Sequence, residues 1–273
     1  MLPWVYDFRW TAGHLIFLSI FFAAVLAAAG TVLIALRRAR RDLAAGRAGR
    51  ILWHGEFEEL PRSARRCRHA FTGEMPGRIC PLAFDCRECP THGKLLEAGG
   101  APEPVMSAPG GLRVSPDRLY HRGHAWVRPL EGGYALVGLD DLARRLAGRP
   151  EAVELPGVGT GLEANLPAWK VRRNGAEVTI PAPIDGTVVE TAAGGEPWVL
   201  KVKTEQPLDT RHLLRGAEVG AWLAAELERL QLLGSGIQGM AALADGGVLV
   251  EDLADALPAD QWERICGEML LEA

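Results

Sequence analysis

Four of the five cysteines lie within 23 residues of one another, a grouping of metal-ligating side chains. They are Cys67, Cys80, Cys86 and Cys89, and the last two form a C-x2-C pair. This spacing lets two thiolates grip one ion from a tight turn, and the first two can complete a tetrahedral set. We therefore expect a four-cysteine site for zinc or an iron–sulfur cluster, between which the spacing does not decide.

Two other interpretations of these cysteines stay open. Cys86 and Cys89 have the spacing of a redox dithiol, and all four are compatible with free thiols in a core. The flanking His69 and His92 are candidate substitute ligands or outer partners of a metal site. Cys266 stands alone in an amphipathic C-terminal stretch, where we expect a core residue.

An uncharged run near the N-terminus predicts the compartment of these thiols. Residues 15–36 carry no charge, and as a helix of about 33 Å they can cross a hydrocarbon core of about 30 Å. Six arginines follow between residues 37 and 50, whereas only Asp7 and Arg9 precede the run. The positive-inside rule then gives a single-pass protein of the cytoplasmic (inner) membrane, with its N-terminus outside and its soluble part in the cytoplasm.

A cleaved signal peptide is the alternative for this run. Its charges would precede the apolar core, whereas here they follow it, so we expect an uncleaved anchor. In a reducing cytoplasm structural disulfides are disfavoured, which agrees with metal-ligating cysteines.

The residue composition and hydrophobic pattern change along the rest of the chain. Residues 98–118 hold four prolines and four glycines and predict a linker. Residues 119–203 have short alternating apolar runs between turn signals, typical of a small β domain, with one helix at 140–147 capped by Asp140 or Asp141. Helical spacing returns at 209–233 and 260–271. The expected α+β chain thus has segments 1–36, 37–97, 98–118, 119–203 and 204–273.

Five segments of the β domain share sequence and order with one known family. They are 120–127 (YHRGHAWV), 137–143 (VGLDDLA), 153–159 (VELPGVG), 183–190 (PIDGTVVE) and Trp198. In these residues the domain resembles the H protein of the glycine cleavage system. The resemblance implies a lipoyl-type hybrid-motif β sandwich or barrel and a hairpin whose tip lysine carries a lipoyl arm.

The residue that would carry this arm is absent. In the family the lysine lies eight residues before the proline that matches Pro183, a position held here by Gly175. Asn174-Gly175 between two alternating runs predicts a two-residue type I′ hairpin with no lysine at its tip. Of the chain's four lysines only Lys170 is near, inside the incoming strand. We expect no lipoate, and attachment at Lys170 is the alternative.

The net charge and the absence of a catalytic motif exclude several classes of function. A net charge of −4 excludes a generally nucleic-acid-binding protein, and the ten arginines against four acids in residues 37–70 fit contact with anionic lipid. No nucleophile–base–acid set has motif support, so we expect no enzyme. The hypothesis is a membrane-anchored scaffold or interaction protein with a metal site, in a membrane redox assembly with an unidentified protein partner. The alternative is a lipoyl carrier of a glycine-cleavage-type system.

Overall fold

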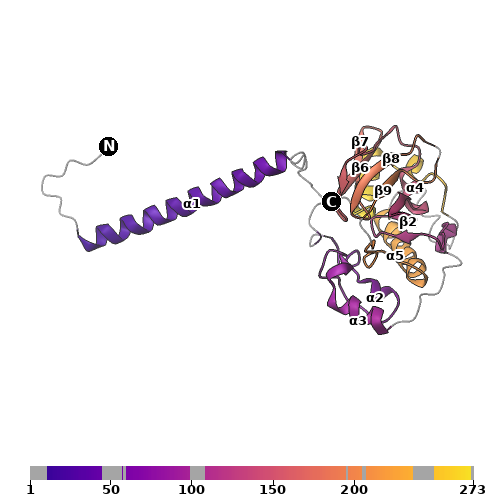
Figure 1. Cartoon of the computed structure of the whole chain (residues 1–273), viewed down its shortest axis with the longest axis horizontal. Coiled ribbons are helices and arrows are strands. Elements are labelled where there is room, and N and C mark those ends of the chain that lie inside the picture. The colour runs from indigo at the N-terminus through magenta and orange to yellow at the C-terminus, as the bar shows by residue number, and fades with distance from the viewer. Residues whose placement is uncertain are drawn as a thin grey trace. The chain divides into compact units, whose positions relative to one another are not determined.

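The computed structural model describes residues 11–44, 57, 60–98, 108–194, 196–204, 207–235 and 249–271 (Figure 1). Contacts divide the chain into two compact units, Met1–Trp53 and His54–Ala273. The first unit contains the apolar run, and the second contains the cysteines and both sheets.

In its described residues the first unit is one helix, α1 (Ala12–Ala44). Over Ala12–Leu33 it is free of Asp, Glu, Lys and Arg and has a mean hydropathy of 2.5, and none of the span is buried inside the protein. A helix of this length and composition can cross a membrane. Its backbone continues through the arginines to Ala44, so the boundary expected at residue 36 falls inside the helix rather than at its end.

The second unit is built on two antiparallel sheets. The larger sheet has strand order β1-β2-β3-β9-β8-β5, and the smaller has β4-β6-β7. The strands are β1 (Leu119–Tyr120), β2 (Ala125–Leu130), β3 (Tyr134–Leu139), β4 (Ala152–Glu154), β5 (Gly161–Leu162), β6 (Pro167–Arg173), β7 (Ala176–Pro181), β8 (Gly186–Thr191) and β9 (Leu200–Lys203). They fall within residues 119–203, where a small β domain was expected, and the chain as a whole mixes helix and sheet.

The core is shared between the sheets and the helices packed on them. Trp126 on β2 and Trp169 on β6 are each 1 % exposed, and the helical Leu142, Trp222 and Trp262 are 0–2 % exposed. Burying a large apolar side chain of this kind contributes about 2–3 kcal/mol relative to leaving it in water. The same core therefore fastens the helices that follow the β domain to its sheets.

Helix α4 (Asp141–Ala147) connects the two sheets. The side chain of Asp140 accepts a hydrogen bond of 2.8 Å from the backbone N–H of Ala143, which is the N-cap expected from the sequence. The helix ends at Gly148, whose φ of +59° favours glycine. The cap sets the direction in which α4 leaves β3.

The C-terminal region forms α5 (Ala217–Leu233) and α6 (Ala259–Met269), with a single 3₁₀ turn, η4 (Ala254–Ala256), before α6. Helix α5 begins at Ala217 rather than at residue 209. Gly216, with φ +57°, interrupts the helix, and Leu214 instead pairs with Tyr120 as an antiparallel bridge. Helix α5 ends at Gly234, as expected. Helix α6 packs against β7 and α4, and the buried Cys266 confirms the expected core position.

The segment expected to be a linker is partly packed. Residues 99–107 lie outside the described residues, but a 3₁₀ turn, η2 (Pro109–Gly111), follows them. The carbonyl of Gly110 accepts a 3.0 Å hydrogen bond from Leu249, and Arg113 pairs with the buried Asp141 at 3.0 Å. From residue 108 onward this segment is therefore part of the second unit.

Candidate functional site

The β6–β7 hairpin carries the position at which the sequence departs from the resemblance. Arg173 pairs with Ala176, so that Asn174 and Gly175 alone form the loop. Both have positive φ, +50° and +77°, as a type I′ turn requires. The predicted hairpin is confirmed, and its exposed tip carries an amide and a glycine instead of an amine.

Lys170 lies in the middle of β6, opposite Thr179. Its ammonium forms an ion pair with Glu177 on β7, and its side chain is 33 % exposed. Arg172 bonds to the same carboxylate at 2.7 Å and to Glu154 on β4 at 2.8 Å. These contacts join the three strands of the small sheet, and they hold Lys170 along the sheet surface, away from the hairpin tip.

The cysteines belong to a segment that we call the cysteine module, residues 60–98. A backbone bridge between Arg66 and Ile79 pairs the residues that come directly before Cys67 and Cys80. The N–H of Cys67 donates to the carbonyl of Arg78 at 2.9 Å, and that of Cys80 donates to Arg65 at 2.8 Å. Short helices α2 (Arg68–Phe71), η1 (Cys86–Glu88) and α3 (Pro90–Ala98) complete the module. The C-x2-C pair lies on the η1 turn.

The four thiols share one environment. Cys67 and Cys80 are buried, and Cys86 and Cys89 are partly exposed. Burial raises the pKa of Cys86 to about 11, against the opposing effect of Arg68, and it also raises the pKa of Cys67. Neighbouring cysteines add to both shifts.

This neighbourhood is not a closed metal site. Among the residues that the structure describes, no three His, Cys, Asp or Glu side chains are placed to hold one ion. Nε2 of His69 and Nδ1 of His92 are 2.9 Å apart, and His69 also bonds to Glu74. The geometry therefore adds no support to the predicted zinc or iron–sulfur site.

Two buried arginines and a partly exposed one fasten the cysteine module to the β domain and α5. Arg68 donates to Glu218 on α5 and to the carbonyl of Leu213, both at 3.0 Å. Arg122 donates to the carbonyl of Arg66 at 2.6 Å, and its guanidinium lies 3.9 Å from the ring centroid of Phe84. The third, Arg87, bonds to Asp185 of the β domain. Figure 1 shows α2 beside α5, in agreement with these contacts.

A buried ionic cluster lies between the β domain and α5. Nδ1 of His124 is 2.7 Å from Asp140, and Nε2 is 3.9 Å from Glu226 on α5. The imidazole stacks on Trp222 with 4.7 Å between ring centroids. Burial lowers the pKa of His124, but the two carboxylates outweigh it and raise the pKa to about 9. The charged imidazole thus links α4 to α5.

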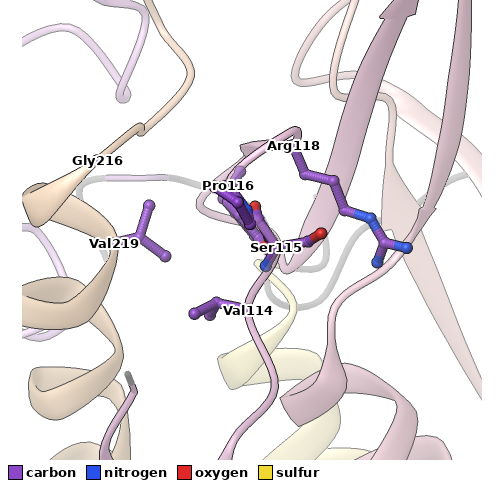
Figure 2. A pocket seen from close by; sticks show the side chains of 7 residues that line it. Val114, Ser115, Pro116, Arg118, Gly216 and Val219 are labelled. Carbon is purple, nitrogen blue, oxygen red and sulfur yellow. Dashed lines mark hydrogen bonds between the residues drawn. The ribbon is translucent and has the colours of Figure 1, made fainter. Parts of the chain in front are cut away.

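A water-sized hollow lies at the beginning of α5. It encloses about 30 Å³ and is lined by Val114, Ser115, Pro116, Arg118, Tyr120, Gly216 and Val219. Figure 2 shows Val219 facing the Val114–Arg118 loop, with the side chain of Arg118 extending away from the helix. This volume suits ordered water rather than a substrate.

Comparisons with known proteins address the β domain. The profile of the family described as "Glycine cleavage H-protein" matches residues 118–197. Curated H proteins of Opitutus terrae and Chlorobaculum tepidum are 32 % and 33 % identical to this chain over 123 and 120 residues. The alignments cover 97 % and 94 % of those proteins and 40 % and 39 % of this chain. A crystal structure of an H protein from Mycobacterium marinum is 24 % identical, with a TM-score of 0.34, and covers 94 % of that chain and 38 % of this one.

The chain belongs to the glycine cleavage H-protein family. The resemblance predicted for residues 119–203 is thereby confirmed. The profile match does not extend to α1, the cysteine module or the C-terminal helices. This H-protein relative therefore contains α1, the cysteine module and C-terminal helices in addition to the β domain that the profile matches.

Several residues that organise this H-protein relative were not predicted. Arg68 and its partner Glu218 are 150 positions apart, and Glu226 meets His124 from α5. Nothing in the local sequence marks such pairs, because each depends on how α5 packs. The nearest available signal in the sequence was an arginine directly after Cys67, inside the expected metal module.

Proposed function

We propose that this protein is a membrane-tethered H-protein-like docking module that carries no lipoyl arm and catalyses no reaction itself. The observation that carries the proposal is the hairpin tip, where Asn174 and Gly175 provide no amine. Lys170 does not replace the missing lysine, since its strand position and ion pair with Glu177 hold it along the sheet. A swinging arm needs a projecting attachment point, which this hairpin lacks.

The membrane part of the proposal rests on α1. Ala12–Leu33 has the length and composition of a single span, and the arginines that follow favour a cytoplasmic location for the second unit. Tethering would hold the H-protein-like domain close to a membrane-bound protein partner. Such a partner belongs to the cytoplasmic face of the inner membrane.

A second part concerns the thiols of the cysteine module. Cys67, Cys80, Cys86 and Cys89 are the right ligand type for zinc or an iron–sulfur cluster, and all four belong to the cysteine module. Closing a site would require the partly exposed η1 turn to approach the buried pair. A cluster there would fit a membrane redox assembly, whereas zinc would be structural.

Intact mass of the full chain, purified from cells that attach lipoate to proteins, tests the missing arm. We expect the unmodified mass for the native chain. Gly175→Lys restores an amine at the tip and serves as the matched control, which we expect to gain a lipoyl group. A lipoyl increment on the native chain that disappears in Lys170→Arg would overturn the proposal and establish a lipoyl carrier instead.

A further inference from the structure

An open cleft lies beside the base of the hairpin, on the second unit. It has a volume of about 500 Å³, which is in the range of small-molecule sites. Its apolar lining includes Trp169 and Val171 of β6, Leu139 at the end of β3 and Val153 of β4. The first two are buried, and Val153 is 43 % exposed. The cleft is therefore a trough with a buried apolar floor, charged walls and an accessible apolar rim.

The opposite wall comes from residues outside the family match. Glu251, Asp252 and Asp255 line the cleft and belong to the segment before α6. This segment is tied down at several points: the N–H of Leu253 donates to the carbonyl of Arg145 at 2.9 Å, and Arg145 in turn donates to the carbonyl of Leu249. A wall fixed in this way needs little ordering when a ligand binds.

Most charges that line the cleft or approach it are already paired. Arg113 and Arg145 bond to Asp141, which is 6 % exposed. Arg173 bonds to Asp255 and approaches Asp252 to 4.0 Å. The positive charge still available to a ligand in the cleft therefore comes from two other arginines.

Arg144 and Arg149 are exposed and have no ion-pair partner among the residues that the structure describes. Glu251 is the single lining carboxylate in that same part of the chain without an ion pair at 4 Å or less. The unpaired charges are therefore two positive and one negative. An apolar trough with a cationic excess complements an apolar molecule that ends in an anion.

We propose that this cleft binds a small carboxylate with an apolar body, whose body lies against the accessible Val153 and Leu139 and whose carboxylate is held by Arg144 and Arg149. This site is independent of the function proposed above, because it uses neither the hairpin tip nor the cysteines. The C-terminal wall makes it a property of this chain rather than of the matched β domain.

Titration calorimetry on the full chain in detergent micelles tests the site with two probes of equal size. The probes are 3-phenylpropionate and its uncharged amide, 3-phenylpropanamide, both of which are water-soluble. We expect the carboxylate to bind at least about tenfold more tightly than the amide, since only the carboxylate can form charge-assisted hydrogen bonds with the two arginines. Equal binding of the two, or no binding of the carboxylate at millimolar concentration, overturns the proposal.

Substitutions of residues that line the cleft test whether the probes bind there. The double variant Arg144→Gln/Arg149→Gln should weaken carboxylate binding about tenfold or more, whereas Arg215→Gln, an exposed arginine outside the cleft, should not. Val153→Trp narrows the trough from its exposed rim and should weaken both probes. The thermal midpoint of each variant reports folding separately. Unchanged affinity in both cleft variants would show that binding occurs elsewhere and overturn the assignment.

Discussion

Nδ1 of His124 lies 2.7 Å from the carboxylate of Asp140, and both side chains are buried in the core. Glu226 of α5 faces the other ring nitrogen at 3.9 Å, and Arg229 bonds to Glu226 at 3.2 Å. Four charges thus meet between the N-cap of α4 and helix α5. Because each charge has a partner of opposite sign, the cluster stabilises the packing only while all four groups remain ionised.

The stability of the protein should therefore depend on the protonation of His124. Its pKa of about 9 in the folded chain exceeds the ordinary value of 6.5, so its contribution is complete below about pH 6.5. That contribution is lost as pH rises through about 9, and it amounts to about 3 kcal/mol. Urea unfolding from pH 6 to 10 measures it.

His124→Gln is the variant that checks this assignment. It should be less stable than the native chain at pH 6 and lack the stability loss between pH 7 and 9. His14→Gln, on α1 in the other unit, is the control and should keep the native profile. A native chain whose unfolding free energy is flat over this interval would contradict the charged imidazole.

Arg68 should control whether the cysteine module stays docked. Its side chain is 4 % exposed, and removing its charge leaves the partly buried Glu218 without its ion-pair partner. Breaking a pair of this kind costs about 3 kcal/mol. Arg68→Gln should increase hydrogen exchange in residues 60–98 while β6 and β7 keep their protection. Arg62→Gln, an exposed neighbour, should leave exchange unchanged; equal exchange in the two variants would show that Arg68 does not hold the module.

Features encoded locally were predictable from the sequence. The type I′ turn at Asn174-Gly175 follows from two residues that tolerate positive φ, and the Asp140 cap follows from one side chain and the next turn of helix. The start of α5 was misplaced because the apolar periodicity of Leu213 and Leu214 resembles a helix. Gly216 and the bridge to Tyr120 decide otherwise.

Features that join distant segments were not predictable. The cleft wall, the Arg68–Glu218 pair and the Glu226–His124 contact each require α5 or the 249–257 segment to be docked first. Cysteine spacing gave the ligand type of a candidate metal site but not the distances between sulfurs. Spacing constrains the loop between two ligands, whereas the distance across the module depends on its fold.

Metal analysis of the anaerobically purified full chain tests the cysteine site. We expect zinc or iron at about one metal site per chain, with visible absorption only if a cluster is bound. Cys86→Ser and Cys89→Ser should lose the metal, because both remove thiolate ligands from the partly exposed turn. Cys266→Ser, in the core of the C-terminal region, should retain it. A chain free of both metals would leave the four thiols without a cofactor and remove the redox part of the proposed function.

The membrane span should depend on the apolar character of α1 near its centre. Leu26 is 72 % exposed on the helix, where lipid would surround it. Leu26→Arg places a charge near the middle of the span at a cost of about 3 kcal/mol, so more of the chain should appear in the alkaline-extractable fraction. Leu26→Val keeps the surface apolar and should remain with the membrane. N-terminal sequencing of the membrane-bound chain distinguishes an uncleaved anchor from a signal peptide: a chain that begins after Ala29 would contradict the anchor, because cleavage there would remove most of the apolar run at residues 15–36.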